Sequence, residues 1–201
     1  MLDQTPAFRL STLLHRHSTA IQSLRTCCKM SGPSLPSFTE INRMTNITLR
    51  PWRRSDMKAC MAIWRAGSEL GHPFLSHAEL DADAVLVRSI YMPATDVTVA
   101  EQSGEILGFI ALSGSFIGAL FVAPARHRQG LGRKLLAHAA RKHPLLQVEV
   151  YAENPAARRF YTASGFIETL CYLTDDQGRP HPLIRMQRDA AARPAPVQTA
   201  A

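Results

Sequence analysis

The segment that decides the fold is Leu120-Phe-Val-Ala-Pro-Ala-Arg-His-Arg-Gln-Gly-Leu-Gly-Arg-Lys-Leu-Leu136. Its apolar start predicts a strand, which runs through a basic turn with glycines at 130 and 132 into an amphipathic helix. Glycine allows the backbone to come close to a ligand. The first N–H groups of a helix have no partners within it and lie at the positive end of its dipole. The pattern therefore predicts an anion site, suited to a diphosphate, where this helix begins.

Basic side chains surround the glycine turn, which favours a polyphosphate over a single carboxylate. They are Arg126, Arg128, Arg133 and Lys134. The alternative is an ordinary strand-to-helix turn with solvated arginines. Two other nucleotide-binding classes are excluded. A Walker loop needs Ser or Thr after its lysine, where this chain has Leu135, and a dinucleotide-binding turn needs a third glycine.

The bulk composition is that of a globular chain with a preference for anionic partners. The 201 residues are 46% hydrophobic and 19% charged, and the formal net charge is +7. We find no nucleic-acid reading motif and expect no nucleic-acid partner. No apolar run approaches the roughly 18 residues that a membrane-spanning helix needs, so we expect no membrane partner either.

The cysteines indicate a reducing compartment. Cys27, Cys28, Cys60 and Cys171 show no C-x-x-C spacing and no matching histidine pairs. We therefore expect reduced thiols, no metal site and a cytoplasmic location. The apolar surroundings of Cys60 and Cys171 predict that both are small core residues.

The two ends of the chain differ from its centre. Residues 1–43 are rich in Ser, Thr and Arg and contain only two acidic residues, so they read as an extension. They resemble either a transit peptide or the product of a start site placed too early. We favour the second, because Met44-Thr-Asn-Ile-Thr-Leu-Arg-Pro51 looks like the opening of a domain. Residues 44–188 form the expected domain, and residues 189–201 a disordered tail.

The centre of the chain alternates strands with helices, and hairpins flank it, which predicts a mixed α/β sheet. Ser55 is the predicted N-cap of a helix that Gly67 and Gly71 end. The remaining expected helices are 78–91, 131–142 and one from residue 154; the expected strands are 47–50, 96–100, 105–113, 116–122, 146–151, 166–173 and 181–187.

Asn154-Pro155 is a strong helix start, because asparagine is a favoured N-cap and proline a favoured first residue. We expect this polar cap to be exposed. Helical spacing places Asn154, Ala157 and Tyr161 along one face, while Phe160 points to the core. The alternative for Tyr161 is a packed tyrosine bonded to a carbonyl.

The glycine turn followed by Asn154-x-x-Ala157-x-x-Phe160-Tyr161-x-x-x-Gly165-Phe166 resembles the GNAT superfamily of acyl-CoA N-acyltransferases, over residues 45–188. The blocks Ile63-Trp64 to His72-x-Phe74-Leu75 and Asp176-Gln-Gly-Arg-Pro-His-Pro-Leu183 resemble a small bacterial subgroup, the YjaB-type peptidyl-lysine acetyltransferases. One departure stands out. Many members carry Arg or Gln and then Gly at the positions held here by His127 and Arg128, so the turn has lost a glycine.

The resemblance implies one mixed, mostly antiparallel sheet of about seven strands, with flanking helices and splayed central strands. Acetyl-CoA would lie where those strands part, as co-substrate and without a metal. The residues it would contact are Leu120, Phe121, Val122, His127, Arg128, Gln129, Gly130, Leu131, Gly132, Arg133, Asn154 and Ala157.

The resemblance further implies transfer of the acetyl group to a primary amine by direct attack. Tyr161 would be the general acid for the departing thiolate. Glu149 is our candidate base, because alternation in residues 147–151 sets it on the face opposite Val148 and Val150. The alternatives for Glu149 are a surface carboxylate or a partner for a nearby arginine.

The acceptor stays open at this point: a peptide lysine, a protein N-terminus or a small amine. His72 and Phe74 would belong to a loop that walls the acceptor site, or would simply pack a helix connection. The competing function is a non-catalytic acyl-CoA-binding regulatory module. Either a monomer or a homodimer is compatible with the sequence.

Overall fold

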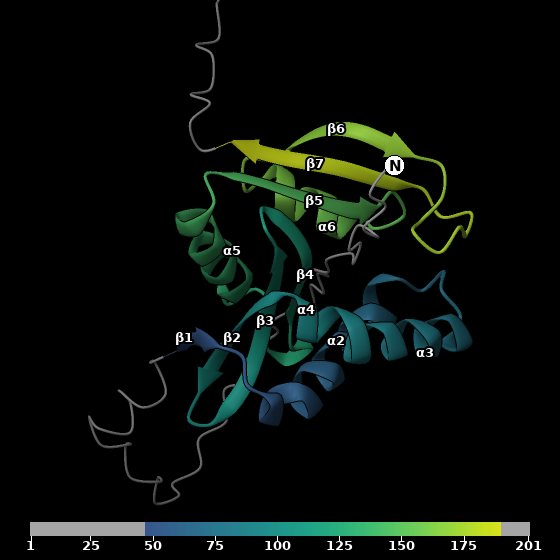
Figure 1. Ribbon diagram of the computed structural model, residues 1–201. Helices are drawn as coiled ribbons and strands as arrows, with labels where there is room; N and C mark the ends of the chain where they lie inside the picture. The colour runs from purple at the N-terminus through teal and green to yellow at the C-terminus, as the bar shows by residue number, and fades with distance from the viewer. Residues whose placement is uncertain (1–46, 190–201) are drawn as a thin grey trace, which may run out of the picture.

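The computed structural model describes residues 47–189 as one seven-stranded sheet with helices on both faces (Figure 1). The strand order is β1-β2-β3-β4-β5-β7-β6, and of the described strand pairs only β4 with β5 is parallel. This confirms the mixed, mostly antiparallel sheet. The strands are β1 (Thr48–Pro51), β2 (Asp96–Gln102), β3 (Glu105–Ser113), β4 (Phe116–Val122), β5 (Leu145–Tyr151), β6 (Ile167–Tyr172) and β7 (Leu183–Asp189).

The expectations for residues 1–43, and for the tail beyond residue 189, lie outside the described residues. Asp189 itself is the last residue of β7, so the sheet reaches one residue into the segment assigned to the tail.

The helices lie where the sequence pattern predicted them, but some of their ends differ from the prediction. They are α2 (Met57–Gly71), α3 (His77–Leu86), α4 (Met92–Ala94), α5 (Leu131–Lys142) and α6 (Pro155–Thr162). The π-helical segment η2 (Val87–Tyr91) connects α3 directly to α4, and η1 (Arg54–Asp56) and η3 (Pro124–Arg126) are short 3-10 helices. Asp56, not Ser55, is the N-cap of α2, and the helix continues through Gly67 to Gly71. A Cβ on Gly67 would lie 2.7 Å from Cδ1 of Phe121, so this glycine allows α2 to pack closely on β4 and does not end the helix.

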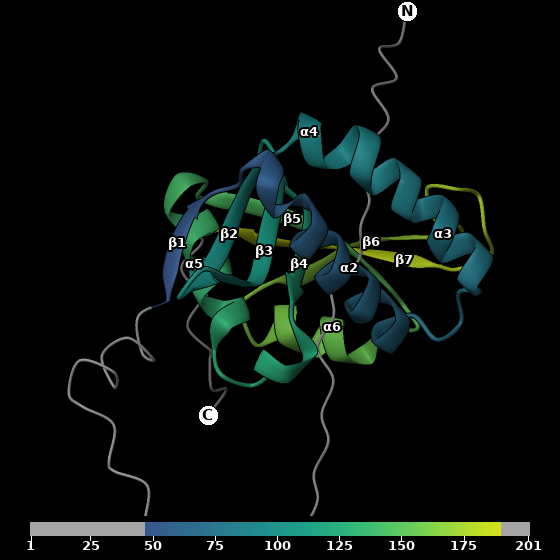
Figure 2. The same cartoon turned by 90° about the horizontal axis from the view of Figure 1, so that it is seen from below.

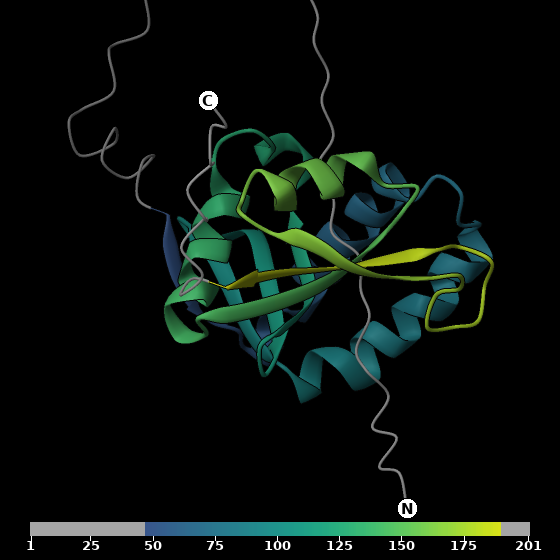
Figure 3. The same cartoon turned by 90° about the horizontal axis from the view of Figure 1, so that it is seen from above.

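The helices cover the sheet from two sides. One core cluster joins the strands to α5 and α6 through Leu135, Ala139 and Phe160, and the other joins them to α2 through Cys60 and Trp64. Figures 2 and 3 show α3 and α6 on opposite sides of strands β6 and β7. Each strand of the centre is therefore buried on both faces, as the apolar run of β4 predicted.

The central strands β4 and β5 part soon after they meet. Their pairing consists of Phe116 with Gln147 and Ile117 with Val148. Beyond this point β4 continues to Val122 beside β3, and β5 continues to Tyr151 beside β7. The splayed centre is thus confirmed, and Glu149 is the first residue of β5 past the last β4 pair.

The two described cysteines lie in different surroundings. Cys60 is buried in α2, as predicted, and burial raises the pKa of its thiol to about 12. The prediction that Cys171 is a core residue is wrong, because it lies on β6, the edge strand, where it is exposed. Within residues 47–189, no helix is long and apolar enough to cross a membrane, and no cluster of His, Cys, Asp or Glu could hold a metal ion.

Candidate active site

A cavity of about 520 Å³ lies between the start of α5 and one face of α6. Most of the turn residues that the sequence singled out face it, together with residues of α6 that the sequence analysis did not assign. The lining residues are Val122, Arg126, His127, Arg128, Gly130, Leu131, Gly132, Arg133, Ala156, Arg159, Phe160 and Ala163. The basic turn therefore forms a wall of a site large enough for part of a nucleotide-like ligand.

The backbone of this turn bends through two left-handed residues. Gly130 is the N-cap of α5 with φ of +80°, and Arg128 has φ of +64°. A Cβ at Gly130 would meet no atom within 4 Å, so its backbone angle, not crowding, favours glycine there. Arg128 thus adopts a backbone conformation that favours glycine. Non-glycine residues held in this region are often found at functional sites.

Arginines give the cavity a positive charge. Arg126, Arg128 and Arg133 come from the turn and α5, and Arg159 comes from α6. The sequence analysis missed Arg159. Its signal was the helical spacing of Ala156, Arg159 and Ala163, which places them along a face of α6 next to the one we chose. An anionic ligand would be drawn to this end of α5 by these side chains and by the helix dipole.

The predicted face of α6 lies in the core. Tyr161 is fully buried, and its ring contacts those of Phe160 and Phe166 at centroid distances of 5.1 and 5.0 Å. Ala157 is buried beside it. Phe160, which we expected to point only to the core, both packs there and lines the cavity.

Asn154 is the N-cap, since its Oδ1 accepts a hydrogen bond from the Ala157 N–H at 2.9 Å. The expectation that this cap is exposed is wrong, because only 2% of Asn154 is accessible. Just two residues separate it from β5, and its own N–H donates to the Tyr151 carbonyl, so the cap stays against the sheet.

The end of β4 is tied to the turn. His127 Nε2 lies 2.9 Å from the carbonyl oxygen of Val122. Leu120 and Phe121 are buried within β4 and do not line the cavity, and Gln129 donates to the Ala125 carbonyl within the turn itself. Of the predicted strand residues, only Val122 thus reaches the cavity.

Glu149 lies on the other face of β5, where it pairs with an arginine. Its carboxylate is 1% exposed, and Arg185 of β7 donates to Oε1 from Nη2 at 2.7 Å and from Nε at 2.9 Å. Arg185 also lies over the ring of Tyr172, 5.3 Å from its centroid. This is the arginine partnership that the sequence left open as an alternative. The role of Glu149 as a base stays a prediction.

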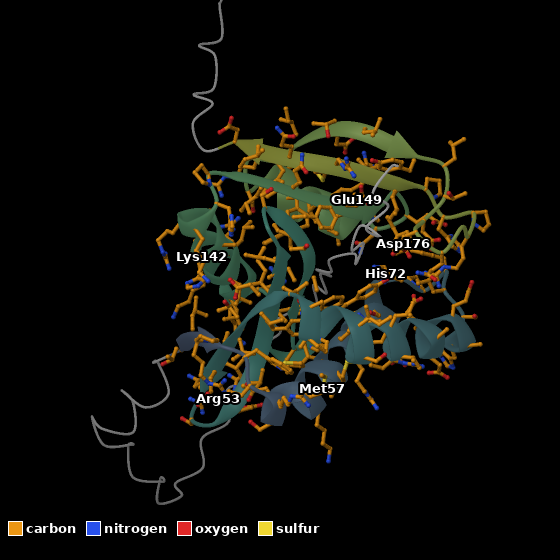
Figure 4. All side chains as sticks on the ribbon, in the orientation of Figure 1. Arg53, Met57, His72, Lys142, Glu149 and Asp176 are labelled. Carbon is orange, nitrogen blue, oxygen red and sulfur yellow. The ribbon has the colours of Figure 1, made fainter. Side chains whose placement is uncertain are left out.

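The loop between α2 and α3 packs on the same side as Glu149 (Figure 4). His72 is buried, and its ring lies 4.9 Å from Tyr151 and 5.7 Å from Phe74. Burial, and secondarily the charge of Arg179, lower the His72 pKa to about 3. Phe74 is half-buried and also contacts His181. The observed contacts of His72 and Phe74 are therefore those of residues that pack the connection between two helices, which is one of the two alternatives that the sequence left open.

A charged cluster that the sequence did not reveal holds the loop before β7 against α3 and β5. Arg179 donates to Asp83 at 3.0 Å and to Asp175 at 2.5 Å, and Tyr151 donates to Asp175 at 3.1 Å. Burial and then the neighbouring Asp175 raise the pKa of Asp176 to about 6. A small internal cavity of about 20 Å³ lies among these residues and His72.

Comparison with known proteins places the chain among acetyltransferases. A family model described as the acetyltransferase (GNAT) domain matches residues 93–168. The chain is 36% identical over 134 residues to the peptidyl-lysine N-acetyltransferase YiaC of Escherichia coli K12, covering 66% of this chain and 91% of YiaC. It is 34% identical over 141 residues to YjaB of Salmonella typhimurium, which has the same descriptive name, covering 70% of this chain and 97% of YjaB.

The fold leads to the same group. The solution structure of the apo form of YjaB from Escherichia coli superposes with a TM-score of 0.67 at 33% identity, covering 73% of this chain and 100% of that chain.

Proposed function

This chain belongs to the GNAT family of acetyltransferases, and we propose that its acceptor is the side-chain amine of a lysine in a peptide or protein. The protein is an enzyme that moves an acetyl group from acetyl-CoA to an amine. The names of YiaC and YjaB support a lysine over a small amine or a protein N-terminus. Nothing in these relatives favours a non-catalytic regulatory module.

The cavity at the start of α5 is the observation that carries the assignment of the acetyl-CoA site. It combines a left-handed glycine, the first amides of a helix and several arginines beside parting strands. In the proposal, amides of residues 128–133 bind the diphosphate, and Arg128 and Arg159 supply charge. The backbone of residues 120–122 pairs with the pantetheine arm in the manner of an added strand.

Asn154 and Ala157 are proposed to contact the same arm. Asn154 uses its Oδ1 as the helix cap, so the amide nitrogen is its donor group toward a ligand. Its burial at the start of α6 supports this role, because a side chain fixed by capping is already oriented.

The proposed reaction assigns one proton transfer to each of two side chains. A lysine amine has an ordinary pKa near 10.4, so Glu149 takes one proton from the ammonium. The freed nitrogen forms the C–N bond at the thioester carbonyl, and the N–H of Val122, which points away from β3, stabilises the oxyanion. As the C–S bond breaks, Tyr161 donates its proton to the thiolate and receives the second amine proton in return.

Replacing Tyr161 with Phe tests this assignment. The buried ring keeps its contacts with Phe160 and Phe166, so the fold is retained. We expect kcat to fall by about 10² to 10⁴, the usual contribution of a general acid, with acetyl-CoA affinity within about twofold of wild type. Thiol release and the mass of a lysine peptide measure turnover. Tyr91→Phe, in η2, is the matched control. Full kcat in Tyr161→Phe would refute the assignment.

The proposal also covers the cellular compartment and the oligomeric state. The cytoplasm is the proposed compartment, because both described cysteines are free and such thiols persist under reducing conditions. The active species is proposed to be a monomer or a homodimer, which sedimentation equilibrium of the full chain would distinguish.

A further inference from the structure

The pair Glu149–Arg185 stands where an acceptor would have to arrive. Glu149 is the first residue of β5 beyond its last pair with β4, so it lies where the central strands begin to part. Its face of the sheet is shared with Tyr151, which packs against the α2–α3 loop, whereas Val148 and Val150 face α5 and α6. The carboxylate is therefore on the side opposite the cavity at the start of α5.

The carboxylate and the arginine differ sharply in exposure. The Glu149 side chain is 1% exposed, whereas that of Arg185 is 28% exposed. Solvent thus reaches the arginine side chain but hardly reaches that of its carboxylate partner. A buried carboxylate needs a cationic or hydrogen-bonding partner, and Arg185 supplies one here.

The guanidinium of Arg185 contacts a carboxylate and an aromatic ring, the two kinds of group that would bind a cationic ligand. Both of its contacts with Glu149 go to one oxygen, Oε1, and its guanidinium lies over the Tyr172 ring at 5.3 Å. A carboxylate combined with an aromatic face is the usual recognition site for an ammonium or guanidinium group. Arg185 reaches this site by a flexible alkyl stem, as a lysine side chain would.

We propose that Glu149 and Tyr172 form the cation subsite of the acceptor and that Arg185 occupies it until a lysine ammonium replaces the guanidinium. The inference rests on the proposed function, since it takes lysine as the acceptor. Arg185 sets acceptor selectivity: a cationic side chain can replace it, whereas a neutral one leaves the buried carboxylate without its partner. Glu149 then receives the ammonium proton only after this exchange.

Arg185→Gln tests the exchange by removing the internal competitor. The apparent affinity of a ligand falls by the fraction of sites that are closed to it, so opening the site should lower KM for a lysine peptide by about fivefold. KM for acetyl-CoA should change by less than about twofold, because the subsite lies on the face of the sheet opposite the cavity at the start of α5. Arg185→Lys keeps an internal cation and should retain a KM near that of wild type. An unchanged or higher KM in Arg185→Gln would overturn the proposal.

A binding measurement separates the subsite from turnover. Methylguanidinium should bind Arg185→Gln at millimolar concentration in calorimetry, and the neutral isostere N-methylurea should not. Binding should disappear in the double variant Glu149→Gln/Arg185→Gln. If the double variant binds equally well, Glu149 is not the subsite.

A measurement on the wild-type protein covers the case in which Arg185→Gln does not fold. In protein labelled with ¹⁵N-arginine, the Nε signal of Arg185 should shift when a lysine peptide is added. It should stay unchanged when norleucine, which lacks the amine, replaces the lysine of that peptide. No shift with either peptide would overturn the proposal. Methylguanidinium binding without acetylation of any lysine peptide would support the subsite and refute lysine as the acceptor.

Discussion

Arg128 and Gly130 both adopt left-handed backbone angles in the turn before α5, with φ of +64° and +80°. Glycine takes such an angle at no steric cost, whereas most other residues, with Asn and Asp as the main exceptions, are disfavoured by roughly 1–2 kcal/mol. The chain therefore holds an arginine in an unfavourable conformation at the wall of the cavity that the first residues of α5 also line. Unfavourable backbone conformations cluster at ligand-binding sites, which supports a role for the Arg128 side chain in binding.

Arg128→Gly should consequently separate stability from ligand binding. Relief of the backbone angle, partly offset by the greater freedom of glycine in the unfolded chain, should raise the free energy of unfolding by up to about 1 kcal/mol. Loss of the guanidinium should weaken acetyl-CoA binding by about tenfold, the effect of one charged hydrogen bond. Urea unfolding measures the free energy of unfolding, and calorimetric titration measures the affinity for acetyl-CoA. Arg128→Asn, which tolerates the angle without a charge, should lose the same affinity.

The two turn glycines should respond differently to alanine. Gly130 needs its positive φ, so Gly130→Ala should cost about 1–2 kcal/mol and distort the start of α5. Gly132 lies inside the helix, and its added Cβ would lie 3.5 Å from Phe160, an ordinary contact. Gly132→Ala should therefore leave the free energy of unfolding within about 1 kcal/mol of wild type, or raise it, because alanine favours helix. Equal losses in both variants would contradict this account.

The elements that the sequence predicted best are those fixed by local pattern. The apolar run of β4, the amphipathic stripe of α5 and the Asn154–Pro155 start of α6 are each readable within one turn or one strand. Gly67 was misread as a helix end because glycine is favoured there by close packing against the ring of Phe121, which is far away in the sequence. Cys171 was misread because the pattern does not say that its strand is at the edge of the sheet.

The residues of the candidate site also divide into those with a local sequence signal and those without one. The turn residues were found because glycine and arginine chemistry is local. The partner of Glu149 is 36 residues away, and it is set by the register of β5 with β7, which no local pattern encodes. Arg179, in the loop before β7, and Asp83, in α3, are 96 residues apart, and the packing of that loop on the helix brings them together. Pairs set by contacts between distant elements are therefore the ones that the local pattern does not predict.

Asp176→Asn should stabilise the protein at neutral pH but not in acid. Burial, then Asp175 and Asp83, raise the Asp176 pKa from 3.8 to about 6, against the smaller opposing effects of a backbone hydrogen bond and the charge of Arg179. Above pH 6 the folded protein carries a charge that its surroundings disfavour; below about pH 3 the carboxyl is protonated in both states and the difference vanishes. The variant should gain on the order of 1 kcal/mol at pH 8 and nothing at about pH 3. Thermal unfolding across this range measures it, and a gain that grows toward acid would contradict the assignment.

His72→Phe should act in the opposite pH range. The folded protein keeps His72 neutral down to about pH 3, whereas the unfolded chain binds a proton below about 6.5, so wild-type stability falls as pH drops between these values. Phenylalanine keeps the ring contacts with Tyr151 and Phe74, removes this loss, and removes an Nε2 that has no hydrogen-bond partner among residues 47–189. Unfolding curves at pH 7 and pH 4.5 should show a shallower acid loss than wild type, whereas His77→Phe, at an exposed position of α3, should not. An unchanged KM for the lysine peptide in His72→Phe would leave His72 with packing alone, and a raised KM at full stability would place it at the acceptor.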